Sequence, residues 1–192
     1  MRALVCGLAL VAGSCFASPE PLFDGESLDG WRVRGAPYWR VVGDTLIGQS
    51  DAGKKNSVLW TKESFGDFEL SFEFRYAGDI DSGVFLRQEN DQIQIGISRS
   101  LKRDMTASPY IGSKRGYPKE AKQAKDVLKP GDWNRMTIRA VGNVYVVHLN
   151  GIKVMDYSSE TAKEEGPIGL QVHPGVVMKI EFRDVQIDRL DD

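Results

Sequence analysis

Cysteine and histidine are scarce in this chain of 192 residues, which contains two of each. Both cysteines, Cys6 and Cys15, lie within the first 17 residues. The rest of the chain therefore has no disulfide bond, no thiolate nucleophile and no cysteine-ligated zinc site. The chain also lacks a large excess of charge of either sign, because 25 basic and 27 acidic residues give a formal net charge of −2. This balance argues against a nucleic-acid-binding protein, which needs a basic face.

Long apolar runs are absent except at the N-terminus. Arg2 precedes an apolar run over residues 3–12, and small residues follow as far as Ala17. This order predicts a signal peptide over residues 1–17, and hence an exported protein, periplasmic or secreted. The alternative is a lipoprotein anchored through an acylated Cys15. No later stretch approaches the ~18 apolar residues of a membrane-spanning helix, so we expect no transmembrane span in the mature chain.

Residues 18–192 have the length of one globular domain, and much of this stretch alternates apolar with polar side chains. Such alternation is typical of a strand with one buried face. It is clearest over residues 68–76, 92–97, 135–140, 168–173 and 178–183. Turn dipeptides at 142–143 and 150–151 flank a further apolar segment at 144–149, as expected for hairpins. The pattern predicts an all-β fold, an antiparallel two-sheet sandwich of jelly-roll type.

One long segment, residues 98–131, lacks strand periodicity. Between Arg99 and Lys129 it contains nine basic and three acidic residues. A short helix is predicted over residues 118–128, with Pro118 near its start. Loops of this length are often lids or binding loops. The alternatives are a solvated surface excursion and a basic surface that binds another protein.

The outward positions of the predicted strands are of two chemical kinds. Over 68–76, 135–140 and 178–183 they are mostly Glu, Lys and Arg. On the other strands they are amides, glycines, one aromatic ring, one arginine and one histidine. These are Gly83, Phe85, Arg87, Gln92, Gln94, Gly96, Gly169, Gln171 and His173.

The second kind of outward surface suits a sugar. Amides donate and accept hydrogen bonds, and an aromatic ring offers an apolar platform for a sugar ring. Glycines between them would let a ligand approach the backbone. We therefore predict a carbohydrate-binding trough, the alternative being an ordinary polar surface. Its central side chains are expected to be Arg87, Gln92, Gln94, Gln171 and His173.

Seven segments, in this order, resemble one known family. They are 22–31 (LFDGESLDGW), 59–62 (LWTK), 65–70 (FGDFEL), 82–87 (SGVFLR), 131–134 (GDWN), 149–151 (LNG) and 166–173 (GPIGLQVH). The chain resembles the 3-keto-disaccharide hydrolase family, whose domains adopt a concanavalin-like lectin/glucanase sandwich. The resemblance implies an enzyme that cleaves glycosides carrying a ketone at C3. A non-catalytic carbohydrate-binding module of the same fold is the alternative, because such sandwiches host both.

The implied substrate has a definite chemistry. A C3 ketone acidifies the C2 hydrogen, so a base can remove it and the C1 substituent can leave, with or without later hydration. This requires a base near C2 and a hydrogen-bond donor at the enolate oxygen. The resemblance implies His173 for proton transfer and Arg87 as the enolate clamp. A loop-anchoring hydrogen bond for His173 and a structural ion pair for Arg87 are the alternatives.

Further substrate-binding residues are predicted, and one residue departs from the family pattern. The predicted substrate contacts are Gln92, Gln94, Gln171, Phe85, Tyr110 and Lys114. Relatives often carry Glu where this chain has Gln92, and a neutral amide is neither a base nor a strong cation ligand. This favours the binding-only alternative, although Asp79 or Asp81 could supply a carboxylate. We expect no metal or cofactor, since the two histidines offer no ligand spacing.

Overall fold

The computed structural model describes residues 18–190. The predicted signal peptide, with Cys15, lies outside the described residues. In the part that is described, strands predominate and the two helices have four residues each. No helix there has the length and apolarity needed to cross a membrane.

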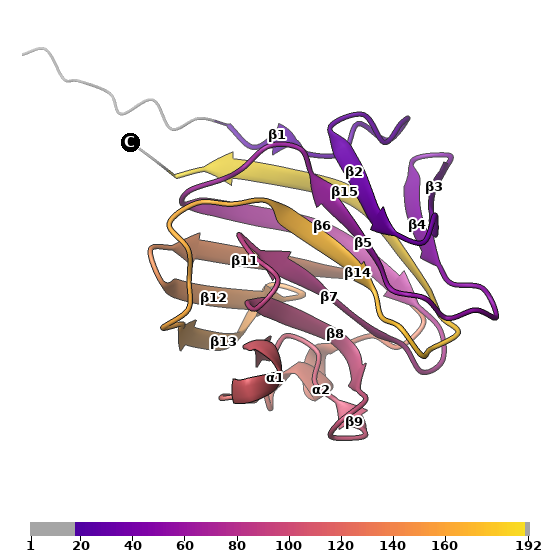
Figure 1. The fold of residues 1–192 in the computed structure, drawn as a ribbon. Coiled ribbons are helices and arrows are strands. Elements are labelled where there is room, and N and C mark those ends of the chain that lie inside the picture. The colour runs from indigo at the N-terminus through magenta and orange to yellow at the C-terminus, as the bar shows by residue number, and fades with distance from the viewer. Residues whose placement is uncertain (1–17, 191–192) are drawn as a thin grey trace, which may run out of the picture.

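Two antiparallel sheets form the fold (Figure 1). The first sheet consists of β1 (Glu20–Pro21), β3 (Trp39–Val42), β4 (Thr45–Gln49), β6 (Phe68–Tyr76), β11 (Asn134–Val141), β12 (Val144–Leu149), β13 (Ile152–Ser158) and β15 (Lys179–Arg189). Their order is β13-β12-β11-β6-β15-β4-β3, and β1 pairs with β15.

The second sheet lies against the first. It consists of β2 (Trp31–Gly35), β5 (Ser57–Thr61), β7 (Asp81–Leu86), β8 (Gln92–Ser98), β9 (Arg103–Asp104), β10 (Pro109–Tyr110) and β14 (Ile168–Val172). Their order is β10-β8-β7-β14-β5-β2, and β9 pairs with β8. The prediction of an all-β, two-sheet antiparallel sandwich is confirmed.

The core lies between the sheets and uses the apolar half of each alternating strand. In β6 the fully buried side chains are Phe68, Leu70, Phe72 and Phe74. Phe72 packs edge-on against Phe182 of β15, with ring centroids 5.8 Å apart. Each such side chain contributes about 1.5–3 kcal/mol by its burial. The inner faces are thereby filled, and the outer faces of both sheets are left for solvent or ligand.

The hairpins follow the predicted turn residues. Strands β11 and β12 pair up to Val141 opposite Val144, on either side of residues 142–143. The next turn, between β12 and β13, has positive φ at Asn150 (50°) and Gly151 (83°). Positive φ at both central residues is the geometry of a type I′ turn, whose twist matches the flanking strands.

Residues 98–131 fold into a packed layer beside β8. This layer contains β9, β10 and two short helices, α1 (Gly112–Arg115) and α2 (Ala124–Val127), gathered along one edge of the second sheet (Figure 1). The helix predicted over 118–128 is wrong in extent, because only residues 124–127 are helical. The backbone N–H of Ala121 donates to Ser108 Oγ at 3.0 Å, which ties this segment to the layer instead of to a helix.

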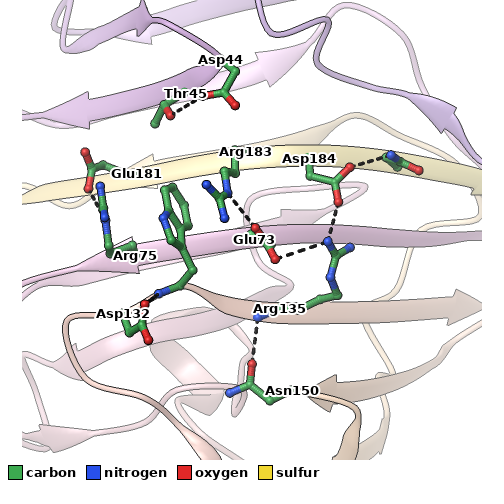
Figure 2. Close-up of polar contacts among 12 residues, drawn as sticks. Asp44, Thr45, Glu73, Arg75, Asp132, Arg135, Asn150, Glu181, Arg183 and Asp184 are labelled. Carbon is green, nitrogen blue, oxygen red and sulfur yellow. Dashed lines mark hydrogen bonds and ion pairs between the residues drawn. The ribbon is translucent and has the colours of Figure 1, made fainter.

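The outer face of the first sheet is covered by paired charges (Figure 2). Glu73 of β6 accepts a hydrogen bond from Arg183 Nε at 2.7 Å. Its other carboxylate oxygen lies 3.4 Å from a guanidinium nitrogen of Arg135. Arg135 also pairs with Asp184. These four charged residues therefore satisfy one another, as on an ordinary wet sheet surface.

Candidate functional site

The outer face of the second sheet carries a cavity of about 350 Å³. This volume is at the low end of the range for small-molecule sites, about 300–1,000 Å³. Six of the predicted site residues line the cavity, namely Phe85, Gln92, Gln94, Tyr110, Gln171 and His173. The lining also includes Asp81, which the sequence offered as a carboxylate, and residues that were not predicted, among them Asn90, Arg99 and Tyr117.

Strand register explains why these residues meet. Tyr110 of β10 lies opposite Gln92 of β8, and Gln92 lies opposite Phe85 of β7. Phe85 lies opposite Gly169 of β14. Residues in register across a sheet project from the same face. The sequence alternation that predicted their common face therefore places them in one row across four strands.

Two amide hydrogen bonds organise the cavity floor. Gln92 Nε2 donates to Gln171 Oε1 at 2.7 Å, and Gln94 Nε2 donates to Asp81 Oδ1 at 2.9 Å. All four residues are buried, so these bonds hold the side chains in fixed positions. A glutamine amide has two N–H donors and an oxygen with two lone pairs. One bond each therefore leaves both amides with further capacity for ligand hydroxyls.

Two glycines of this face make room for neighbouring side chains. A Cβ at Gly83 would lie 2.3 Å from Gln92 Nε2, and one at Gly169 would lie 2.7 Å from the Trp60 ring. The Gln92 amide and the Trp60 indole thus pack closely over these two glycines, on the adjacent strands β7 and β14. The expectation that these glycines let a ligand approach the backbone is wrong, because protein side chains already fill both places.

His173 and Asp81 meet at one end of the cavity. Asp81 begins β7 and His173 follows β14, and antiparallel pairing of these strands brings the two ends together. His173 Nε2 lies 3.9 Å from Asp81 Oδ2, with side chains 32% and 6% exposed. His173 Nδ1 lies 2.6 Å from the carbonyl oxygen of Pro174.

The contact with Pro174 determines which ring nitrogen of His173 is free. A carbonyl oxygen only accepts hydrogen bonds, so Nδ1 must carry the proton. In the neutral ring, Nε2 then has an unprotonated lone pair within the cavity wall. The predicted alternative, a hydrogen bond to a loop, is present, but it uses Nδ1 and orients the ring. The ring is therefore oriented through Nδ1, and the Asp81 carboxylate lies 3.9 Å from the free Nε2.

The layer of residues 98–131 supplies the opposite wall. Tyr110 and Tyr117 contact each other there, with ring centroids 5.1 Å apart and planes at 54°. Burial raises the pKa of Tyr117 to about 12, so its hydroxyl remains a donor at physiological pH. The backbone N–H of Arg99 donates to Asp81 Oδ2 at 3.1 Å. Among residues 18–190, no hydrogen bond or ion pair engages the Arg99 guanidinium.

Arg87 does not reach this cavity. Strand β7 ends at Leu86, and Arg87 has a φ of 61°, so its side chain no longer follows the alternation of the strand. The side chain is fully buried. Its guanidinium donates to the carbonyl oxygens of Gly142 (2.6 Å), Lys163 (2.9 Å) and Ala140 (3.1 Å) and to Asp67 Oδ1 (3.0 Å). The expected place of Arg87 in the trough is therefore corrected, and these contacts match the alternative of a structural ion pair.

Lys114 is the other predicted contact that the structure leaves outside. It is exposed on α1, and the cavity is instead lined by its neighbours Gly112 and Ser113. Residues 98–131 carry no periodicity that could show which of their side chains turn inward. The sequence therefore gives no signal for Arg99 and Tyr117, and it does not show that Lys114 lies outside the cavity.

Comparison with known families gives a clear result. The sequence model of the 3-keto-alpha-glucoside-1,2-lyase-like domain matches residues 18–188. The chain belongs to this family. The match confirms the resemblance seen in the sequence. A search of curated proteins finds no significant match.

Solved structures support the same fold for this lyase-like domain. A protein provisionally named a glycosyl hydrolase, from Parabacteroides distasonis, has a TM-score of 0.67 at 24% identity and covers 91% of this chain and 100% of its own. The carbohydrate-binding module CBM66 from Bacillus subtilis has a TM-score of 0.54 at 15% identity, covering 83% and 95%. A Bacillus subtilis protein with a galectin-like fold has a TM-score of 0.56 at 15% identity, covering 92% and 96%. The concanavalin-like sandwich is confirmed.

Gln92 contributes a neutral amide to the cavity of this lyase-like domain. Gln92 places a neutral amide where the resemblance implies Glu, and the amide is bonded to Gln171. Asp81, which the sequence offered as a replacement carboxylate, lies in the same cavity, whereas Asp79 does not line it. Within residues 18–190 no group of three His, Cys, Asp or Glu side chains could hold a metal ion. The histidine and carboxylate side chains that line the cavity are His173, Asp81 and Glu89, and Glu89 forms an ion pair with Arg34.

Proposed function

We propose that this domain cleaves the glycosidic bond of 3-keto-glycosides by removing the C2 proton, with His173 as the base. Family membership and fold support a domain of the carbohydrate-active or carbohydrate-binding kind. The observation that carries the catalytic proposal is the lone pair of His173 Nε2. This nitrogen lies in the wall of a sugar-sized cavity, and Asp81 Oδ2 lies 3.9 Å from it.

The reaction begins with proton transfer. His173 Nε2 takes the C2 proton, and the C–H electron pair moves into a C2–C3 double bond, which leaves an enolate on the C3 oxygen. The enolate collapses as the C1–O bond breaks, and the leaving oxygen receives a proton from the imidazolium or from water. The sugar product is an unsaturated ketone. Addition of water across its C1–C2 double bond would complete net hydrolysis.

Each step has a suitable group in the cavity. Asp81 would stabilise the imidazolium formed at His173. Two opposite charges about 4 Å apart attract by about 1 kcal/mol in bulk water and by about 4 kcal/mol near a protein surface. The enolate oxygen requires a donor or a cation. In place of Arg87, we assign this role to the Arg99 guanidinium and the Tyr117 hydroxyl, which line the cavity from the opposite wall.

Substrate orientation is assigned to the floor of the cavity. Gln92, Gln94 and Gln171 would bind the sugar hydroxyls, and Phe85 and Tyr110 would provide apolar ring contacts. Because the amides are already held by protein hydrogen bonds, they would lose little conformational freedom when a sugar binds.

The test of this function uses a substrate labelled at C2. The purified domain is incubated with methyl 3-keto-glucoside, with the same compound deuterated at C2, and with unoxidised methyl glucoside. We expect cleavage of the ketone only and slower cleavage of the deuterated compound. The rates are compared under single-turnover conditions in which the chemical step is rate-limiting. Equal rates for the two isotopologues would rule out proton abstraction at C2.

A non-catalytic carbohydrate-binding module is the second candidate function. The observation that favours it is the neutral amide of Gln92 at the cavity floor, because an amide cannot act as a base. In the same assay this function predicts binding of unoxidised sugar, measured by calorimetry, with no turnover of either compound.

We also propose that the domain acts after export, on the basis of the signal-peptide pattern in residues 1–17. N-terminal sequencing of the mature protein tests this. A start at Ser18 supports a released protein, an acylated Cys15 supports the lipoprotein alternative, and an intact N-terminus contradicts export by either route.

A further inference from the structure

The turn between β7 and β8, residues 87–91, forms part of the cavity wall and ends in a buried carboxylate. Asp91 is fully buried and does not line the cavity. Its two neighbours in the chain, Asn90 and Gln92, both line it. The carboxylate of Asp91 is instead bonded to Tyr145 of β12, in the first sheet. Asp91 therefore anchors the turn in the interior of the sandwich, while the residues on either side of it face the site.

Three side chains hold the Asp91 carboxylate. Tyr145 Oη donates to Oδ2 at 2.7 Å, and Thr161 Oγ1 and Gln88 Nε2 donate to Oδ1 at 2.5 and 3.2 Å. Burial, and next the bond to Asp91, raise the pKa of Tyr145, so its hydroxyl stays protonated and donates. Among residues 18–190, no ion pair engages Asp91. Because a buried charge is costly unless it is bonded, these three donors are what keeps Asp91 in its place.

The loop between β13 and β14 anchors both ends of the turn. Arg87, the first residue of the turn, donates to the carbonyl oxygen of Lys163 at 2.9 Å. Asp91, the last, accepts the bond from Thr161. Between them, Gln88 Nε2 also donates to the carbonyl oxygen of Thr161. A turn held at both ends by buried groups presents its exposed residues in a constant position.

The amide of Asn90 is available to a ligand at this position. Its side chain is exposed on the cavity wall, and in the part of the chain that the structure describes no hydrogen bond engages it. Asn90 Oδ1 packs close to Gly112 of α1, where an added Cβ would lie 3.1 Å away. An amide has two N–H donors and an accepting oxygen, which is the combination that a ring hydroxyl requires.

We propose that Asn90 is a further sugar-binding residue of this cavity and that Asp91 is its positioning residue. The proposal rests on the sugar site that both candidate functions share. Asn90 would bind a ring hydroxyl, and Asp91 would act through Asn90 without touching the ligand. Gln92, on the other side of Asp91, is held independently by its bond to Gln171 and by strand pairing with Phe85. The effect of Asp91 should therefore fall on Asn90.

The experiment is a double-mutant cycle of Asn90→Ala and Asp91→Asn, with KM and kcat measured on methyl 3-keto-glucoside. A neutral hydrogen bond contributes about 0.5–1.5 kcal/mol, so Asn90→Ala should raise KM about two- to tenfold. Loss of binding that is equal in the ground and transition states leaves kcat unchanged. Asp91→Asn should raise KM in the wild-type chain and add nothing in the Asn90→Ala chain. A purely structural role would give equal effects in both backgrounds.

The controls separate positioning from loss of folded protein. Asn56→Ala, at an exposed asparagine that does not line the cavity, should leave KM unchanged. Thr161→Val removes one donor to Asp91 and should reproduce the effect of Asp91→Asn, so it replaces that variant if Asp91→Asn does not fold. The thermal midpoint of each variant is recorded. An unchanged KM in Asn90→Ala, or additive effects in the cycle, overturns the proposal.

Failure of the proposed catalysis is recognised separately. If the wild-type domain does not cleave the ketone, the catalytic proposal fails, and the same cycle is measured by calorimetry as the affinity for unoxidised methyl glucoside. A two- to tenfold loss of affinity in Asn90→Ala, with no further loss when Asp91→Asn is added, keeps both assignments. Absence of sugar binding in the wild-type domain, or an unchanged affinity in Asn90→Ala, overturns them.

Discussion

The outer faces of the two sheets are both polar, yet they differ in how their polar groups are used. On the first sheet, Glu73 and Asp184 are engaged by arginines of neighbouring strands (Figure 2). On the second sheet, glutamine amides with unused hydrogen-bonding groups form the cavity floor, and the guanidinium groups of Arg32 and Arg99 have no partner in the part of the chain described. Unused hydrogen-bonding capacity inside a cavity, and not polarity itself, distinguishes the candidate site from a wet surface.

The aromatic residues of the two faces show the same difference. On the first sheet, the Trp133 ring lies between two arginines, with guanidinium carbons 4.6 Å (Arg75) and 4.1 Å (Arg183) from its centroid. Both cations are thereby occupied by protein. On the second sheet, Trp60 stacks on Phe85 and its N–H has no acceptor. A ligand could complete the second arrangement, whereas the first is already complete.

The largest effect is expected at His173. Because general-base catalysis contributes about 10²–10⁴-fold, His173→Gln should reduce turnover of a 3-keto-glucoside by that factor and leave the fold intact. Circular dichroism and the thermal midpoint check the fold. His148→Gln on β12, in the other sheet, is the control. If both variants retain wild-type turnover, the candidate site loses its base.

The next effect concerns stability. Arg87→Ala removes a fully buried guanidinium that joins three backbone carbonyls and Asp67. Removing one partner of a buried pair costs about 3–5 kcal/mol, and the free energy of unfolding from urea titration should fall by this amount. Arg139→Ala, at an exposed position, should change it by less than about 0.5 kcal/mol. A stable Arg87→Ala protein would contradict the structural role.

A smaller effect is expected from one methyl group at Gly83. The added Cβ would lie 2.3 Å from Gln92 Nε2 and 2.7 Å from the carbonyl oxygen of Ile93. Gly83→Ala should therefore cost about 1–3 kcal/mol of stability by overpacking, and it should also weaken sugar binding by displacing the Gln92 amide. Calorimetry with the sugar and urea unfolding measure the two effects. Unchanged affinity would show that the Gln92 amide does not contact the ligand.

The smallest effect is expected on the first sheet. Glu73→Gln removes the charge that engages Arg183 and Arg135. Exposed ion pairs are worth about 0–1 kcal/mol each, so the loss of stability should be about 1 kcal/mol or less and should shrink in high salt. Turnover should not change. A marked loss of turnover would mean that the two faces are not independent.

Much of the fold could be predicted from the sequence because it depends on local pattern. The alternation over 68–76 coincides with β6, and the dipeptides at 142–143 and 150–151 lie at the predicted hairpins. The extent of the helix predicted over 118–128 was wrong. In so short a segment, tertiary contacts such as the hydrogen bond from Ala121 to Ser108 outweigh helix propensity.

The candidate site could be predicted from the sequence only for residues that lie within alternating strands. Gln92, Gln94 and Gln171 share the cavity because they occupy alternate positions of β8 and β14, the two strands that flank β7. Arg87 lies outside the cavity because its positive φ turns the side chain away from it. Alternation in the sequence does not reveal a positive φ. The partnership of Asp81 with His173 depends on which strand ends are adjacent, and only the sheet order supplies that.

The cross-strand row that begins at Tyr110 continues through Gly169 and Trp60 to Arg32, and this row has a consequence for how the protein folds. Its members come from positions far apart along the chain, near residues 32, 60, 85, 92, 110 and 169. Contacts between such distant segments form slowly, since large loops must close first. We therefore expect ligand binding to appear late in refolding, after the long-range pairing of β2 and β14 with their neighbours. A bound sugar would then favour the native state alone and raise its apparent stability as ligand concentration increases.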